Sequence, residues 1–238
     1  LLYSMEKYAF IPSRTGESET LEDLKKYLTG AGFDVKVLIG KSSIFDAYSD
    51  AVKDFDILAT DHVIMCHDDI QILNDVDSFN RVLDLHFNHP KSGLLGVAGS
   101  KSLPAHCVWW GNYGPTHTPG HPTNHLSGAV FHGKNLETMS LDMYGRYART
   151  VVLDGVFLAA TGALLNSIQL KKPSSFPSGW HFYDIFYTYQ AFRKGFINVT
   201  APILLRHKSG GNPSGTFDDN RQAFISKFGP ELPATTIG

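Results

Sequence analysis

The sequence has only two cysteines, no large excess of charge of either sign and no long hydrophobic run. Cys66 and Cys107 lack the spacing of a zinc site or a disulfide framework, so we expect reduced thiols. Lys and Arg number 21 against 23 Asp and Glu, which gives no reason to expect a nucleic acid polymer as partner. No hydrophobic run reaches the roughly 20 residues that span a bilayer, so we expect no transmembrane segment. A cytoplasmic location follows, with peripheral attachment to a membrane or membership of a longer protein left open.

The chain is long and hydrophobic enough to fold around a core of its own. It has 238 residues, 42% of them hydrophobic, and a chain of this size buries a substantial core without disulfide bonds. Patterns typical of strands and of helices alternate along its first third. The expected strands are 7–13, 33–40 and 62–72. The expected helices are 21–32, with Ser18 or Glu19 as its N-cap, and 43–55. This alternation predicts an α/β fold with a mixed, mainly parallel sheet flanked by helices.

The remaining chain is less regular. A helix is expected over 75–90, ending before the proline, and a buried strand over 93–100. Residues 102–128 are rich in Gly, Pro, His and Trp without periodicity, so we expect irregular structure or short hairpins there, of a kind that is often functional. A further helix is expected over 183–193 and a further strand over 196–207.

Polar residues lie toward the carboxyl end of each of the first three expected strands. In open α/β sheets, ligands bind beyond the carboxyl ends of the strands. We therefore expect the three clusters to converge on one crevice. They are Pro12-Ser13-Arg14, Gly40-Lys41-Ser42 and His67-Asp68-Asp69.

The adjacent carboxylates of Asp68 and Asp69 require a cation, a proton or a basic group nearby. Mg²⁺ and Mn²⁺ prefer oxygen ligands and share them with diphosphates, so a metal site is one interpretation. A turn or a helix cap is the alternative.

A second polar cluster ends the strand at 196–207. His207 offers an imidazole ligand for Mn²⁺, while the flanking residues offer two cations and a hydroxyl to phosphate oxygens. The alternative is a solvated strand edge. The flanking residues are Arg206, Lys208 and Ser209.

Asp184 lies among aromatic residues at the start of the helix expected over 183–193. Burial there raises the pKa of a carboxylate, which makes Asp184 a candidate general base. Helix N-capping is the alternative, and the two roles are compatible.

Four segments in their order along the chain resemble the nucleotide-sugar-dependent glycosyltransferases of the GT-A fold. The similar group is the family 2-like one, which includes small bacterial enzymes and enzymes of large DNA viruses. The resemblance extends from about Tyr8 to Gly211. The segments are VIMCHDDIQI (63–72), VVLDGVFLAATGALL (151–165), GWHFYDIFYTYQAFRKGF (179–196) and PILLRHKSGG (202–211).

The resemblance implies roles for the polar residues of these segments. Residues 67–69 stand where the family has Asp-x-Asp, with His67 replacing the first acid and Asp69 meeting Mn²⁺ (or Mg²⁺). His207 matches a late histidine that completes the metal site. Asp184 matches the acid that deprotonates the acceptor hydroxyl, and Phe186 stands where a second acid is often found.

The resemblance also implies a donor site and an acceptor site in one GT-A domain over 1–238. Residues 1–100 form its nucleotide-binding half and 101–238 its acceptor and catalytic half. The aromatic faces between His106 and His125, including Tyr113, suit sugar rings, with core or lid packing as the alternative. The implied nucleotide-sugar residues are Pro12, Ser13, Arg14, Lys41, Ser42, His67, Asp68, Lys208 and Ser209, with Tyr48 nearby. The implied sugar or acceptor residues are Trp109, Trp110, Asp154, Gly155, Trp180 and His181.

The expected function is metal-dependent transfer of a sugar from a UDP-sugar to a hydroxyl of a glycan or similar glycoconjugate acceptor, with inversion. A metal-dependent phosphohydrolase is one alternative, because His67-Asp68 is similar to the His-Asp pairs of such enzymes. A non-catalytic module that binds nucleotide or sugar is the other.

Overall fold

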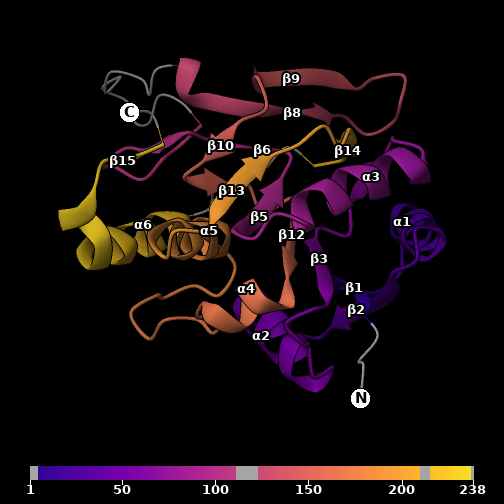
Figure 1. The fold of residues 1–238 in the computed structure, drawn as a ribbon, viewed down its shortest axis with the longest axis horizontal. Coiled ribbons are helices and arrows are strands. Elements are labelled where there is room, and N and C mark those ends of the chain that lie inside the picture. The colour runs from indigo at the N-terminus through magenta and orange to yellow at the C-terminus, as the bar shows by residue number, and fades with distance from the viewer. Residues whose placement is uncertain (1–4, 111–122, 210–214, 237–238) are drawn as a thin grey trace.

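The computed structural model describes residues 5–110, 123–209 and 215–236, which form two large sheets, a small sheet and surrounding helices (Figure 1). The helices are α1 (Glu19–Gly30), α2 (Ile44–Asp54), α3 (Val76–Phe87), α4 (Gly162–Ser167), α5 (Tyr183–Arg193) and α6 (Gly215–Phe228). The strands of the first half are β1 (Lys7–Ser13), β2 (Asp34–Ile39), β3 (His62–Cys66), β4 (Ile70–Ile72), β5 (Ser92–Gly96), β6 (Ala98–Ser100) and β7 (Ser102–Leu103). Those of the second half are β8 (Leu126–His132), β9 (Ser140–Gly145), β10 (Arg149–Thr150), β11 (Val152–Leu153), β12 (Phe157–Thr161), β13 (Ile197–Thr200), β14 (Leu205–His207) and β15 (Ala234–Thr235).

The first sheet has seven strands in the order β10-β13-β5-β12-β3-β1-β2. β1 runs parallel to β2 and β3, whereas β12 runs antiparallel to β3 and β5. The sheet is therefore mixed, and the expected α/β class with flanking helices is confirmed. The second sheet has the order β11-β6-β8-β14-β4, with β9 paired to β8, and β15 pairs with β7 in a small third sheet. Strands from both sides of residue 100 enter each of the two large sheets.

Three segments that the sequence predicts as single strands are each divided between the two large sheets. Residues 62–72 form β3 in the first sheet and β4 in the second, with His67-Asp68-Asp69 between them. Residues 93–100 are divided in the same way into β5 and β6, and 196–207 into β13 and β14. The prediction of unbroken strands is wrong because hydrophobic patterning does not mark where a chain leaves one sheet for another. Only Pro202 gave a local signal, since proline lacks the N–H that a sheet ladder needs.

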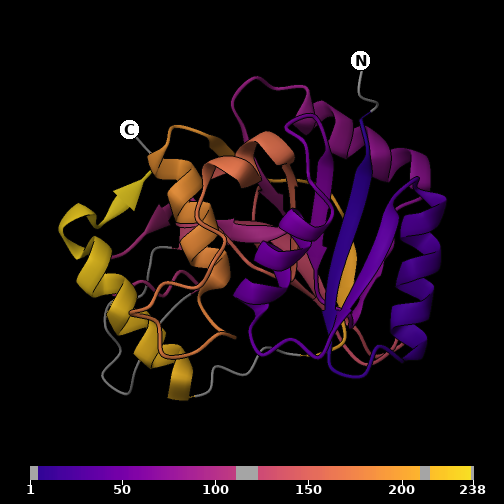
Figure 2. The same ribbon diagram turned by 90° about the horizontal axis from the view of Figure 1, so that it is seen from below.

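The helices cover both faces of the first sheet. α1 and α3 lie together on one side, while α2, α4 and α5 lie on the other, with α6 outside α5 (Figures 1 and 2). Tyr27 of α1 packs edge-on against Phe79 of α3, with ring centroids 5.5 Å apart. Phe45 of α2 packs likewise against Tyr187 of α5 at 5.6 Å. These aromatic contacts belong to one continuous core.

The bounds of α5 and the N-cap of α1 are as the sequence predicts, although α1 itself spans Glu19–Gly30 and not the expected 21–32. α5 spans Tyr183–Arg193 as its pattern predicts, and it ends before Gly195, whose φ of +81° favours glycine. α1 begins after Ser18, whose hydroxyl accepts a hydrogen bond from the amide of Leu21.

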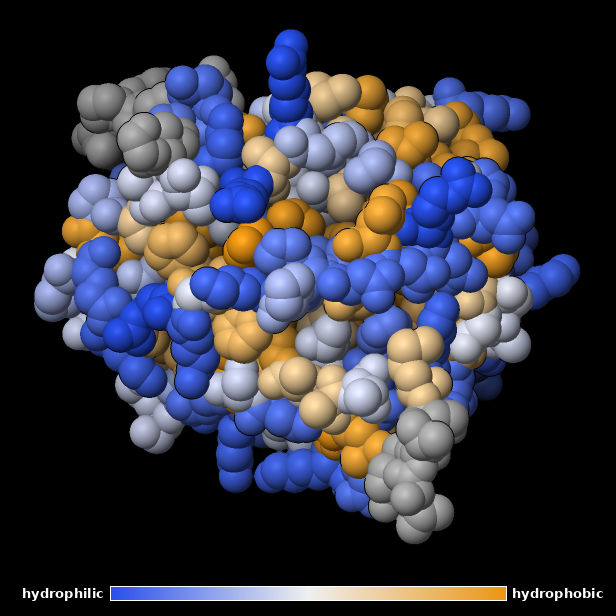
Figure 3. Space-filling view, in the orientation of Figure 1, coloured by the Kyte–Doolittle hydropathy of each residue, from blue (hydrophilic) through white to orange (hydrophobic). Residues whose placement is uncertain are grey.

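The surface in the orientation of Figure 1 is mostly hydrophilic, with smaller hydrophobic areas scattered over it (Figure 3). Leu85 and Met143 are among the exposed large hydrophobic residues, at 73% and 67% exposure. Within the residues described, no helix combines the length and the hydrophobicity that crossing a bilayer requires.

Candidate functional site

A cleft of about 1570 Å³ opens beyond the carboxyl ends of β1, β2 and β3. It is bounded by the three expected polar clusters and, from the second half of the chain, by residues of β8, β9, β14 and the start of α5. The structure therefore brings together most of the residues that the sequence predicts for the site. These are Pro12, Ser13, Arg14, Lys41, His67, Asp68, Trp109, Trp110, Asp154, Gly155, Trp180, His181, Asp184 and His207.

His67, Asp69 and His207 form a compact cluster beside this cleft. One ligand atom from each lies within 4.8 Å of the others. Nε2 of His207 lies 3.3 Å from Oδ1 of Asp69 and 3.4 Å from Nδ1 of His67. The first two residues lie in the turn between β3 and β4, and His207 ends β14, which pairs with β4. The pairing of β4 with β14 thus carries residues that are distant in sequence to one point.

The local electrostatics favour the protonation states of Asp69 and His67 that metal ligation requires. Burial works against ionisation of Asp69, but hydrogen bonds from His207 and Ser209 outweigh it and hold the pKa of Asp69 below its usual range. Burial, followed by the neighbouring His207, lowers the pKa of His67, which favours the neutral imidazole that metal ligation needs. The amide of Ser209 also donates to Oδ2 of Asp69 at 3.2 Å.

The donor set of this cluster fits a divalent cation with mixed nitrogen and oxygen preferences. Two imidazoles and one carboxylate suit Mn²⁺ better than Mg²⁺, which prefers oxygen ligands. His67, for which the resemblance implies contact with the nucleotide sugar, points its Nδ1 atom at the other two side chains. The geometry therefore makes His67 a third candidate ligand.

Asp184 lies in the first turn of α5 and lines the cleft. Its Oδ1 accepts a hydrogen bond from its neighbour's amide, Ile185 N, at 2.8 Å, and its Oδ2 accepts one from Gly155 N at 3.1 Å. Burial, followed by the negative charge of Asp154, raises the pKa of Asp184 to about 7. The alternative of N-capping does not apply, because Phe182 occupies the N-cap position of α5.

Tyr183 connects the two parts of the site. Its hydroxyl lies 3.1 Å from Nε2 of His67 and donates a hydrogen bond to the carbonyl oxygen of Gly155 at 2.9 Å. The same glycine donates its amide hydrogen to Asp184. The backbone of one residue, Gly155, therefore contacts both Tyr183, which lies beside His67, and the candidate base Asp184.

The aromatic residues of the cleft differ in exposure. Trp110 and Trp180 are 39% and 47% exposed and offer flat faces to a ligand. Trp109 is only 1% exposed and packs edge-on against Trp110, with ring centroids 5.6 Å apart, as the alternative of core packing predicts. Tyr113, also expected at an acceptor, lies outside the described residues. Tyr48 is fully buried against Tyr183 and is absent from the cleft lining.

The cations and hydroxyls expected at the nucleotide sugar are distributed unevenly. Arg14 is exposed at the cleft, whereas the ammonium group of Lys41 is held by Asp50 at 2.8 Å. Ser42 does not line the cleft. The hydroxyl of Ser209 lies 3.2 Å from Nε2 of His207, which places it at the histidine cluster.

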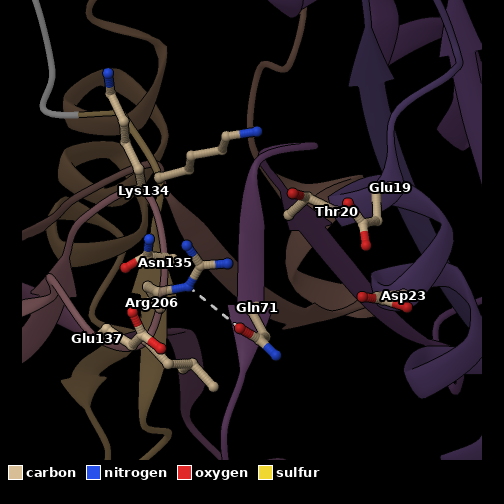
Figure 4. Close-up of a pocket in the computed structure, with 10 residues that line it drawn as sticks. Glu19, Thr20, Asp23, Gln71, Lys134, Asn135, Glu137 and Arg206 are labelled. Atoms are coloured by element: carbon tan, nitrogen blue, oxygen red, sulfur yellow. Dashed lines mark hydrogen bonds between the residues drawn. The ribbon is translucent and has the colours of Figure 1, made fainter.

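Lys208 and Arg206 line a separate pocket of about 450 Å³ (Figure 4). Successive side chains of a strand point to opposite faces, so the residues on either side of His207 turn away from the cleft. Arg206 donates hydrogen bonds to Oε1 of Gln71 at 3.2 Å and to the carbonyl oxygen of Gly133 at 2.9 Å. Neither cation lines the cleft that holds His207.

Several residues of the cleft are not among those that the sequence predicts, and three polar ones come from β8 and β9. His132 ends β8 in register with His207, their ring centroids lie 5.6 Å apart, and Asp142 approaches Nε2 of His132 at 3.5 Å. Tyr144 of β9 is the third. A signal for His132 exists in the sequence, because AVFHGK, like ILLRHK, is a hydrophobic strand that ends in histidine and a nearby lysine. Asp142 and Tyr144 have no such signal.

Two solved structures are similar to this chain. The structure of A197 from STIV is 12% identical over 83% of this chain and 82% of A197, with a TM-score of 0.46. The structure of GalNAc-T7 with UDP, GalNAc and Mn²⁺ is 12% identical over 94% of this chain, with a TM-score of 0.55. This chain spans about half (48%) of the GalNAc-T7 chain. The likeness to GalNAc-T7 shows the GT-A fold. Among curated protein sequences, none matches.

The family model of the Glycosyltransferase like family matches residues 19–207. That range is most of the chain and contains β3, α5 and β14, the elements that carry the histidine cluster and Asp184. The protein is a glycosyltransferase with the GT-A fold, and the chain belongs to the Glycosyltransferase like family.

Proposed function

We propose that this glycosyltransferase moves a sugar from a UDP-sugar to a hydroxyl of a glycan or glycoconjugate, with inversion and with help from a divalent cation. The observation that carries the proposal is the presence of two chemically different centres in one cleft. His67 and His207 line the cleft and, with Asp69 beside it, lie close enough together to hold a cation, whereas Asp184 is a separate carboxylate in the same cleft. Leaving-group departure and acceptor deprotonation need such a pair of centres.

The histidine cluster holds the cation in this proposal, with His67, Asp69 and His207 as its ligands. Mn²⁺ is the preferred ion because the set contains two imidazoles. When bound, the ion neutralises negative charge on the diphosphate leaving group. The choice of UDP and Mn²⁺ is guided by the GT-A-fold structure of GalNAc-T7, which was solved with UDP, GalNAc and Mn²⁺.

Asp184 accepts the proton of the acceptor hydroxyl. Its pKa of about 7 is close to the pH at which a general base works best, because it is partly ionised and still basic. The amides of Ile185 and Gly155 hold its two oxygens in place. Attack by the activated hydroxyl on the anomeric carbon, from the face opposite the leaving diphosphate, inverts the configuration.

The remaining cleft residues bind and orient the two substrates. Pro12, Ser13 and Arg14 lie at the end of β1, where the nucleotide is proposed to bind, and the guanidinium of Arg14 is exposed to it. Trp110 and Trp180 present their faces to the sugar or acceptor, and His181, Asp154 and Gly155 complete that wall. Asp68 lines the cleft beside the histidine cluster.

Product analysis tests the proposal. The protein is incubated with radiolabelled UDP-glucose or UDP-galactose and a mixture of glycan acceptors, with Mn²⁺ or with a chelator. We expect label in a larger glycan and release of UDP, both lost with the chelator. The configuration of the new bond, read by NMR, tests inversion.

Other products would support the alternatives. Release of phosphate without any acceptor indicates a phosphohydrolase. Binding of UDP that is independent of Mn²⁺, with no product, indicates a non-catalytic module. Either result contradicts the proposal.

A further inference from the structure

The hydroxyl group of Tyr183 has a defined direction. It donates its hydrogen to the carbonyl oxygen of Gly155 at 2.9 Å. Among the residues described, Tyr183 is the only hydrogen-bond donor to that oxygen. A buried carbonyl without a partner is costly, so the hydroxyl hydrogen stays on Gly155. Only a lone pair of the tyrosine oxygen therefore faces His67.

This direction selects one tautomer of His67. Nε2 of His67 lies 3.1 Å from the tyrosine oxygen, and with a lone pair facing it, Nε2 has to carry the proton to form a hydrogen bond. In the neutral ring, Nδ1 is then the unprotonated nitrogen. Nδ1 is the atom that points into the cluster, 3.4 Å from His207 and 3.9 Å from Asp69.

Gly155 has to be glycine for this arrangement. A Cβ atom at that position would lie 2.1 Å from the hydroxyl oxygen of Tyr183 and 3.0 Å from Cβ of Asp184. The first distance is too short for nonbonded atoms and the second is tight, so even alanine would displace the tyrosine hydroxyl. The close approach is what allows the Gly155 carbonyl to fix that hydroxyl.

We propose that Tyr183 is a positioning residue that holds His67 in the Nε2-protonated tautomer and so presents its bare Nδ1 atom to the divalent cation. This inference rests on the proposed function, because it needs the metal site formed by His67, Asp69 and His207. Residues behind a metal ligand commonly fix its tautomer and orientation in this way. Through Gly155, the same hydrogen-bond chain reaches Asp184, so the cation site and the base share one support.

The tautomer is measured directly in the metal-free protein. Ring ¹⁵N shifts and long-range ¹H–¹⁵N couplings of His67 are recorded at a pH where the ring is neutral, with His67→Gln used for assignment. We expect an unprotonated Nδ1 and a protonated Nε2. A protonated Nδ1 in the wild-type protein overturns the inference, whatever the protein binds.

Titration calorimetry with Mn²⁺ gives the second readout. Tyr183→Phe removes only the hydroxyl, and we expect it to weaken Mn²⁺ binding about 10- to 100-fold. Tyr187→Phe is the matched control, because Tyr187 lies one turn later on α5 and its buried hydroxyl also donates to a backbone carbonyl, that of Leu170. It makes no hydrogen bond to His67, so its Mn²⁺ affinity should equal that of the wild type.

The outcomes separate this inference from the proposed function. If the wild type binds Mn²⁺ and Tyr183→Phe binds it equally well, or if both phenylalanine variants lose affinity alike, the positioning role is wrong while the metal site stands. If the wild type binds no Mn²⁺, the proposed metal site is wrong, and the tautomer still decides the hydrogen-bond role of Tyr183. Gly155→Ala keeps the tyrosine but displaces its hydroxyl, so this variant should weaken Mn²⁺ binding as Tyr183→Phe does, and an unchanged affinity would contradict the inference.

Discussion

Oδ1 of Asp69 and Nε2 of His207 lie 3.3 Å apart, although the two residues belong to distant parts of the chain. Asp69 follows β3, and His207 ends β14 near the C-terminal helix. The proposed cation site requires that these side chains face each other, and they do. Their approach is fixed by backbone pairing as well, since the amide of Lys208 donates to the carbonyl oxygen of Asp69 at 3.0 Å.

Asp69→Asn should weaken Mn²⁺ binding. The amide keeps the size of the side chain but removes the charge that hydrogen bonds from His207 and Ser209 stabilise. Loss of a direct ligand should cost at least the roughly 10- to 100-fold that loss of an outer-shell partner typically costs. Titration calorimetry with Mn²⁺ measures this loss of affinity. Asp84→Asn, on the exposed face of α3, is the control and should bind Mn²⁺ normally. If both variants bind Mn²⁺ with equal affinity, Asp69 is not a ligand of the cation.

Asp184→Asn should abolish most of the turnover while leaving donor binding intact. An amide accepts no proton, and general-base help is worth typically 10²–10⁴-fold. The rate of sugar transfer gives kcat, and a thermal-shift titration with UDP and Mn²⁺ shows whether the donor still binds. Full activity in this variant would show that the base is another group.

The activity should rise with pH and level off above about pH 7. The base works only when ionised, and burial together with the charge of Asp154 raises the pKa of Asp184 to about 7. Asp154→Asn removes a nearby negative charge, so the pKa of Asp184 should fall and activity should persist to lower pH. The pH profile of kcat/KM measures both. A profile that does not move in Asp154→Asn contradicts this coupling.

The raised pKa also makes a prediction for stability. Between the ordinary carboxyl pKa near 4 and about 7, the folded state holds a proton on Asp184 that the unfolded state has lost. Raising the pH through this window therefore destabilises the fold. Asp184→Asn lacks this titration. The difference between its free energy of unfolding and that of the wild type should therefore shift in favour of the variant as pH rises, and this difference should become constant above about pH 7. Denaturant titrations at several pH values test the sign.

Trp109 and Trp110 should respond differently to replacement by alanine. Trp109 is buried, so its loss should cost about 3–5 kcal/mol of stability. Trp110 is 39% exposed at the cleft, so its loss should raise the KM for the acceptor with a smaller effect on stability. Denaturant unfolding and acceptor kinetics separate the two effects. An unchanged acceptor KM in Trp110→Ala would exclude stacking on this residue.

Much of the scaffold is predictable because its signals are local. The α5 helix follows from hydrophobic spacing and a terminal glycine, and the N-cap at Ser18 follows from residue type. The polar ends of β1, β2 and β3 meet because parallel strands end at one edge of a sheet. This rule alone predicts that Arg14, Lys41 and His67 converge on one cleft, as the structure shows.

The features that the sequence does not reveal depend on pairing between distant strands. The register of β14 turns His207 into the cleft and turns Arg206 and Lys208 away from it. The residue pattern of one strand does not indicate which of its two faces points toward the cleft. Tyr183 looks like one more core aromatic until its hydroxyl is seen between His67 and Gly155. Side-chain direction in such cases is a tertiary property.

The passage of residues 62–72 from the first sheet to the second has a consequence for folding. His67 and Asp69 lie at the crossing point, and His207 is held by the second sheet alone. A partly folded chain with only the first sheet assembled would lack one of the three ligands. Tight capture of Mn²⁺ during refolding should therefore report the pairing of β14 with β4 in the second sheet, and not the formation of the helices or of the first sheet by itself.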